Sequence, residues 1–168
     1  MKENILKAKH WQIFGLIIGI PWILSNWAGN TMSSVSMLVV MMLIFTWFWA
    51  VGTGLQEKIP KNLRMNLKKF KTFLIIPFAY IIFLTVYMGA DLLKGEDNKG
   101  IIGVIIPLHL FSMFCIFYCL YFVSKTIKTV ELGKKVTFGD YAGEFFLTWF
   151  FPFGIWFVQP KINKLSEG

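Results

Sequence analysis

The segment from Ile101 to Val123, IIGVIIPLHLFSMFCIFYCLYFV, contains no Asp, Glu, Lys or Arg, and its single histidine is His109. A helix rises about 1.5 Å per residue, so a helix of this length covers the hydrocarbon core of a bilayer, which is about 30 Å thick. A surface helix of a soluble protein needs a polar face, and this segment has none. The segment therefore predicts a helix that crosses a membrane.

Three more apolar segments precede it, at residues 11–28, 33–55 and 72–93. Only the last of these carries an acid, Asp91, near its end. Because 56% of the 168 residues are hydrophobic, the chain has more apolar surface than a soluble fold usually buries. We therefore predict an all-α protein, with residues 1–168 forming a single membrane domain that is an integral membrane bundle of four transmembrane helices.

Residues 145–158 form a further apolar run that is too short to cross a bilayer unaided. Pro152 and Gly154 break the run near its centre. A longer crossing would also have to bury Glu144 near its start. We therefore expect a short C-terminal re-entrant or interfacial element that does not cross.

Lysine and arginine are distributed on one side of the expected spans. All but two of the 17 basic residues precede the first span, separate the second from the third, or follow the fourth. The exceptions, Lys94 and Lys99, lie beside Glu96 and Asp97. Because basic loops are retained in the cytoplasm, we expect both the N-terminus and the C-terminus to be cytoplasmic. No small-x-small cleavage site follows the first apolar run, so we expect an uncleaved anchor and not a signal peptide.

His109, Met113 and Asp91 are the candidate polar intramembrane site. His109 lies near the middle of its span, and Met113 follows one turn later on the same helix face. An ionisable group at this depth suggests a proton relay or a ligand, whereas a neutral imidazole bonded to a neighbouring helix explains it without chemistry. We expect the second role, with His109 buried, hydrogen-bonded and neutral, and we expect no cofactor and no metal site.

Small residues in the first two spans predict close helix packing. Gly15 and Gly19 form a G-x-x-x-G pair in the first span, and this spacing favours tight contact between membrane helices. Gly52 and Gly54 would let a neighbour approach the second span in the same way.

A basic loop separates the second and third spans. Clustered lysine and arginine beside a membrane attract anionic lipid headgroups, although the orientation of the chain alone would explain them. We expect no nucleic-acid partner, because these charges are tied to the bilayer surface. The residues of this basic loop are Lys58, Lys61, Arg64, Lys68, Lys69 and Lys71.

The tail from Glu144 to Asn163 reads EFFLTWFFPFGIWFVQPKIN. It resembles the C-terminal ending of small, uncharacterised bacterial four-span membrane proteins with a WFFPxGIWxxQPxIN-like tail. The resemblance covers only this tail, and it implies a multi-pass protein of the bacterial inner (cytoplasmic) membrane without implying an activity. The residues that carry it are Trp149, Phe150, Phe151, Pro152, Gly154, Ile155, Trp156, Gln159, Pro160, Ile162 and Asn163.

The sequence contains neither an H-E-x-x-H motif nor a Walker A motif, and it has no acid inside the first, second or fourth span. We therefore expect no enzyme. We predict a non-enzymatic assembly or accessory subunit of a membrane complex, with a membrane-protein partner or a second copy of the chain. The alternative is a small channel, transporter or membrane-perturbing effector in which His109, the tail and helices kinked at Pro21, Pro77 and Pro107 form a pathway or gate.

Overall fold

The computed structural model of the chain describes residues 2–28, 31–89 and 99–167. In this part of the chain all regular secondary structure is helical, as predicted. The predicted site residue Asp91 lies outside the described residues. The elements are α1 (Lys2–Lys7), α2 (His10–Ala28), α3 (Thr31–Lys58), the 3-10 helix η1 (Lys61–Leu63), α4 (Leu67–Gly89), α5 (Lys99–Leu132), α6 (Phe138–Trp149) and α7 (Phe151–Glu167).

Three of the described helices are long and apolar enough to cross a membrane. They are Val35–Lys58 in α3, Leu67–Tyr87 in α4 and Ile102–Leu132 in α5. The described apolar part of α2, His10–Leu24, is shorter. The chain is therefore an all-helical protein with three membrane-length helices and one shorter apolar helix in its described part.

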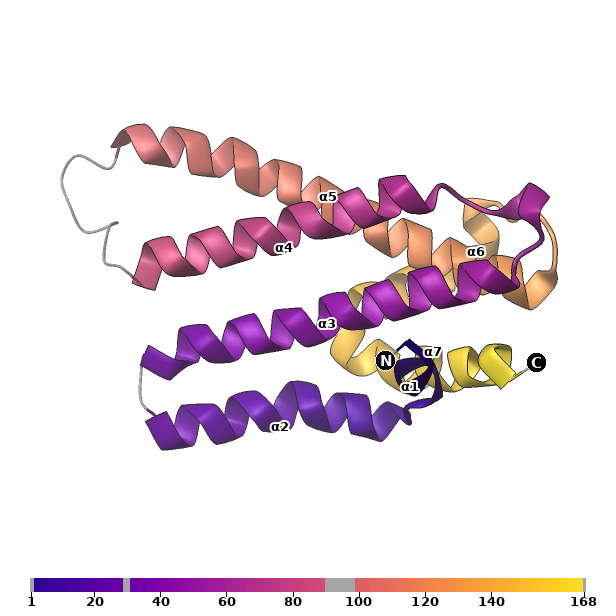
Figure 1. Cartoon of the computed structure of the whole chain (residues 1–168), viewed down its shortest axis with the longest axis horizontal. Coiled ribbons are helices and arrows are strands. Elements are labelled where there is room, and N and C mark those ends of the chain that lie inside the picture. The colour runs from indigo at the N-terminus through magenta and orange to yellow at the C-terminus, as the bar shows by residue number, and fades with distance from the viewer. Residues whose placement is uncertain (1, 29–30, 90–98, 168) are drawn as a thin grey trace.

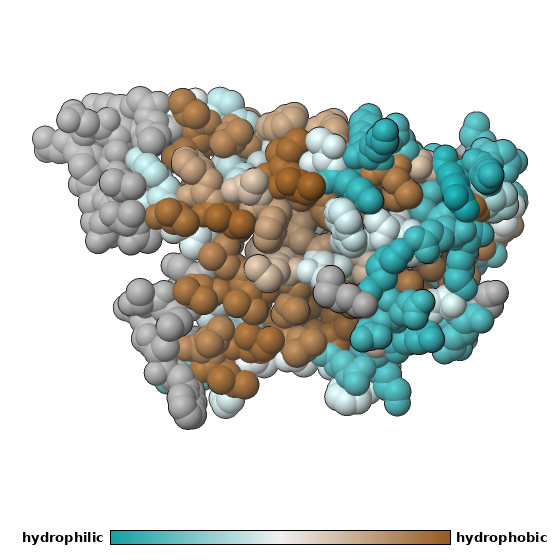
Figure 2. Space-filling model, viewed as in Figure 1, coloured by the Kyte–Doolittle hydropathy of each residue, from teal (hydrophilic) through white to brown (hydrophobic). Residues whose placement is uncertain are grey.

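The long helices form two antiparallel hairpins, α2 with α3 and α4 with α5 (Figure 1). The hairpins lie close together at the end where α1, α6 and α7 are placed, and they move apart toward the opposite end. Hydrophobic residues cover the long helices, whereas hydrophilic residues gather at the end that carries α1, α6 and α7 (Figure 2). We call this hydrophilic end the polar end of the bundle.

The core is tightest near the polar end, where glycines in α3 let neighbours approach. A Cβ at Gly52 would lie 2.5 Å from Cζ of Phe70, and a Cβ at Gly54 would lie 2.6 Å from Cδ1 of Leu6. The Phe70 ring also stacks on Phe122 of α5, with centroids 4.2 Å apart. The close approach expected at Gly52 and Gly54 is therefore confirmed, and it joins α1, α3, α4 and α5.

The start of α6 is fixed by Thr137 and Asp140. The Asp140 carboxylate accepts hydrogen bonds from the backbone N–H of Thr137 at 2.7 Å and from its hydroxyl at 2.8 Å. These hydrogen bonds lower the pKa of the Asp140 carboxyl below its usual value. The cap is therefore formed at neutral pH, and it is lost as the pH falls through the lowered pKa.

α6 and α7 form a third, shorter helical hairpin that reverses at Phe150, where φ is −84° and ψ is 49°. The break lies two residues before Pro152, not at Pro152 and Gly154 as expected. Pro152 fits into the first turn of α7, because that turn has no use for its missing N–H. Gly154 has a different role, since a Cβ there would overlap the backbone carbonyl oxygen of Leu147.

We predict that Gly154→Ala forces α6 and α7 apart and lowers the free energy of unfolding by about 3 kcal/mol, the upper range for overpacking. Gly143→Ala in α6 is the matched control, because a Cβ there meets nothing within 4 Å. The control should raise stability by about 0.5–1 kcal/mol through higher helix propensity. Unfolding in detergent, followed by circular dichroism, measures both changes. Equal effects of the two substitutions would contradict the close contact.

Candidate functional site

Gln159 is fully buried and ties the tail to two distant parts of the chain. Its Oε1 accepts a hydrogen bond of 2.8 Å from Nε1 of Trp47 in α3. Its Nε2 lies 3.0 Å from the carbonyl oxygens of Ile5 and Ala8, at the end of α1. Because the indole N–H is only a donor, this orientation of the amide is fixed by its partners. Gln159 therefore joins α1, α3 and α7.

Asn163 lies one turn after Gln159 and strengthens the same contact. Its Nδ2 donates to the carbonyl oxygens of Ala8 at 3.1 Å and Lys7 at 3.4 Å, and its Oδ1 lies 3.0 Å from Nε2 of Gln159. The last carbonyls of a helix lack partners within that helix, so these amides satisfy groups that α1 leaves open. The Gln and Asn of the Q-P-x-I-N pattern thus form a clamp on the N-terminal helix.

A network of two carboxylates and two ammonium groups joins α5, α6 and α7. Glu144 is buried, with its Oε1 2.6 Å from Nζ of Lys161 and 3.4 Å from Nζ of Lys128. Oε2 of Glu131 lies 2.9 Å from Nζ of Lys128 and 3.1 Å from Nζ of Lys161. Each acid therefore faces two lysines, so the charges of the network balance. Its role is to hold the hairpin of α6 and α7 against α5.

His109 is exposed on the outer surface of α5, so the expectation that it is buried is wrong. Its Nδ1 lies 3.2 Å from Oη of Tyr80, so the expected hydrogen bond to a neighbouring helix is present. The neighbouring Leu110 and Phe111 are also exposed, at 61% and 47%. The reason is the divergence of the two hairpins, which leaves this part of α5 in contact mainly with α4 (Figure 1).

Met113 lies next to a cavity and not at a ligand set. It is 43% exposed, and the described residues contain no group of three or more His, Cys, Asp and Glu side chains that could hold a metal ion. His109 and Met113 therefore share a helix face without a third ligand from the described part of the chain. The third member of the predicted site, Asp91, lies outside the described residues.

A cavity of about 320 Å³ lies between α3, α4, α5 and the turn of the α6–α7 hairpin. The hydroxyl of Thr148, one of the few polar groups on its wall, donates to the carbonyl oxygen of Glu144 and is therefore satisfied. The space suits hydrocarbon and not an ion. The sequence did not predict this cavity, because one of its walls forms only when the tail folds back against α3 and α5. Its other lining residues include Met41, Phe45, Leu74, Met113, Trp149 and Phe151.

Gly15 and Gly19 make no close helix contact with the described residues of the chain. A Cβ added at either position would meet nothing within 4 Å. The pair therefore does not pack inside the bundle, where α3 is approached at Gly52 and Gly54 instead. A role of Gly15 and Gly19 in contact with another chain stays a prediction.

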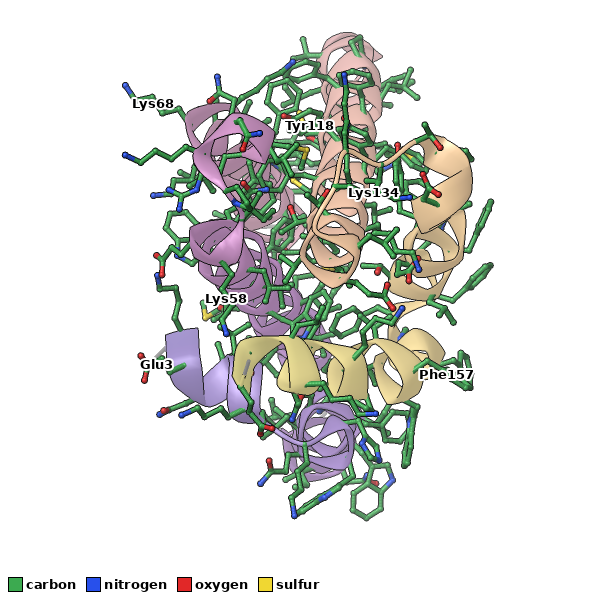
Figure 3. All side chains as sticks on the ribbon, turned by 90° about the vertical axis from the view of Figure 1, so that its right-hand side faces the viewer. Glu3, Lys58, Lys68, Tyr118, Lys134 and Phe157 are labelled. Carbon is green, nitrogen blue, oxygen red and sulfur yellow. The ribbon has the colours of Figure 1, made fainter. Side chains whose placement is uncertain are left out.

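The basic loop lies at the polar end, where Figure 3 shows Lys58 and Lys68 on the same side of the bundle. Nζ of Lys58 donates to the carbonyl oxygen of Ser166 at 2.7 Å, and Arg64 donates to the carbonyl oxygens of Ile59 and Glu57. Lys69 and Lys71 lie over aromatic rings, whereas Lys61 and Lys68 are exposed. Part of the loop therefore stabilises the fold, and part remains free to contact anions.

We predict that Glu144→Gln lowers the free energy of unfolding by about 2 kcal/mol, because both lysines lose a shared, desolvated carboxylate. Glu167→Gln makes the same chemical change at an exposed position of α7 and should alter stability by less than about 0.5 kcal/mol. Denaturant titration in detergent measures both. A Glu144 variant as stable as the Glu167 variant would show that the network does not hold the hairpin.

No family model matches the chain, and no curated protein and no solved structure matches it either.

Proposed function

We propose that the chain is a non-enzymatic, multi-pass membrane protein that acts as an assembly or accessory subunit of a membrane complex. The observation that carries this proposal is the exposed imidazole of His109 in the first third of α5, about 12 Å along the expected fourth span. Its Nδ1 faces Tyr80, and its Nε2 forms no hydrogen bond to the described residues. A polar group facing hydrocarbon is unfavourable, and a second protein surface over α5 would supply the missing partner.

Four crossings are the topology that we propose, with α2 as the fourth. At about 1.5 Å per residue the 19 residues of α2 extend about 28 Å, nearly the thickness of a hydrocarbon core. Trp22 and Ile23 are 68% and 52% exposed, as expected for side chains that face lipid. The polar end carries the basic loop, and α1 and α7 lie there too (Figure 3). Placing that end in the cytoplasm of a bacterium, with both termini inside, agrees with the charge distribution.

The hairpin of α6 and α7 is proposed to enter the membrane from the cytoplasmic side and return. Its turn reaches α3 at Trp47, whose ring centroid lies 4.8 Å from that of Phe151. Trp47 precedes Leu55, the end of the expected second span, by eight residues, or about 12 Å of helix. Phe150 and Phe153, 62% and 76% exposed, would then contact lipid.

The alternative of a channel or transporter requires a polar route through the bundle. The cavity beneath the diverging hairpins is mostly apolar, and the acids and lysines of the α5–α7 network neutralise one another. These features favour packing over ion passage, so the subunit role is preferred.

We predict that His109→Leu shifts the protein from a larger complex to the monomer in native mass spectrometry of membrane vesicles. The substitution also removes the hydrogen bond to the buried Tyr80, so the free energy of unfolding should fall by about 1 kcal/mol, and circular dichroism should show a folded variant. His109→Gln, which keeps hydrogen-bonding capacity, should retain the complex. His10→Leu is the matched control, because it removes the other histidine of the chain, which lies at the start of α2 in the other helical hairpin. A His109→Leu variant that keeps the complex, or a wild-type chain that is monomeric, would overturn the proposal.

A further inference from the structure

An apolar groove of about 230 Å³ runs between α3 and α4 on the outer surface of the bundle. On α3 it is lined at intervals of three and four residues, which places the lining side chains on one helix face. Met42 and Ile75 at its rim are 54% and 57% exposed, so the groove is open to the surroundings. The hydroxyl of Thr46 donates to the carbonyl oxygen of Met42, so it offers no unpaired proton. The lining residues are Met42, Phe45, Thr46, Trp49, Leu74, Ile75 and Phe78.

Lys71 lies at the end of this groove that faces the basic loop. It precedes Leu74 and Ile75 by about one turn of α4, and its Nζ lies 4.9 Å from the centroid of the Trp49 ring. The side chain is half-buried. The ion pairs of the described residues use Lys2, Lys128 and Lys161, so Lys71 has no carboxylate partner among them. A positioned ammonium group thus borders an apolar groove.

The surrounding charge is positive. Residues 58–71 contain six basic residues and no acid. The nearest carboxylate in the sequence, Glu57, is paired with Lys2 at 2.5 Å. Lys69 belongs to a different surface, because its Nζ lies 5.1 Å from the Tyr118 ring centroid on α5. Lys71 is therefore the basic side chain that borders the groove. Lys69 is a nearby lysine on a different surface and can serve as the matched control.

From this juxtaposition we infer a binding site for an anionic glycerophospholipid of the cytoplasmic leaflet, such as phosphatidylglycerol. The phosphate is held by Lys71 beside Trp49, and one acyl chain lies in the groove toward Phe78. Charge complementarity selects the headgroup and the groove selects the chain. A free phosphate would leave the groove empty, and an uncharged chain would leave Lys71 without its anion.

This inference rests on the proposed membrane placement, but not on the proposed complex. It is tested on the purified monomer in detergent, so loss of the complex in the His109 experiment leaves the test intact. The probes are dioleoyl phosphatidylglycerol, dioleoyl phosphatidylcholine and glycerol phosphate. Native mass spectrometry measures the apparent affinity for each.

Lys71→Gln is expected to weaken phosphatidylglycerol binding about fivefold, the effect of one lysine near a membrane surface. Phosphatidylcholine binding should stay unchanged. Lys69→Gln removes the same charge and should change phosphatidylglycerol binding less than twofold. Equal weakening by the two substitutions, or no preference of the wild type for phosphatidylglycerol, overturns the site in favour of diffuse attraction.

The groove is tested by Ile75→Trp, which fills it and should weaken both phospholipids severalfold. Val86→Trp is the control, since Val86 is 64% exposed on α4 and does not line the groove. Glycerol phosphate should not compete with phosphatidylglycerol. Competition at equal concentration would mean a phosphate site without a chain, and unchanged binding to Ile75→Trp would exclude the groove. Either result overturns the inference.

Discussion

The buried side-chain amide of Gln159 is the contact on which the polar end of the molecule depends. One group accepts from the indole N–H of Trp47 and donates to the carbonyls of Ile5 and Ala8 at the end of α1, and without it the buried Trp47 indole would lose its hydrogen-bond acceptor. The contact joins residues more than a hundred positions apart, so it fixes how the tail returns to the bundle. With the tail held there, the turn at Phe150 meets α3 and closes the cavity beneath the diverging hairpins.

The lengths of the apolar segments predicted the three long helices well, because the ability of a helix to cross a bilayer depends on its composition and its length. The same measure does not establish α2 as a span, since its described apolar run, His10–Leu24, is shorter than a full crossing requires. The helix α1 was not predicted, because residues 2–7 are mostly polar and Leu6 is buried only through the gap left by Gly54. The break of the tail was predicted at Pro152, but proline is compatible with the first turn of a helix, and the reversal falls at Phe150.

The candidate sites depend more on tertiary structure than the helices do. The depth of His109 along α5 follows from counting residues, whereas its exposure follows from the divergence of the hairpins, which no local pattern encodes. We expected the tail not to cross the membrane partly because a crossing would bury Glu144. The structure does bury Glu144, and it pairs this carboxylate with Lys128 and Lys161. Glu144 is thus satisfied within the chain, and the exposed imidazole on α5 is the feature from which we propose a partner.

The depth of the α6–α7 hairpin is the most direct test of the proposed arrangement. Spin labels at Phe153→Cys and Lys164→Cys, in a chain whose buried Cys115 and Cys119 are replaced, report access to oxygen and to a water-soluble nickel complex in oriented vesicles. A re-entrant hairpin predicts that the label at 153 favours oxygen, and that the label at 164 meets nickel only from the cytoplasmic side. Nickel access at 153, or access to 164 only from the opposite side, would contradict a hairpin that enters the membrane and returns.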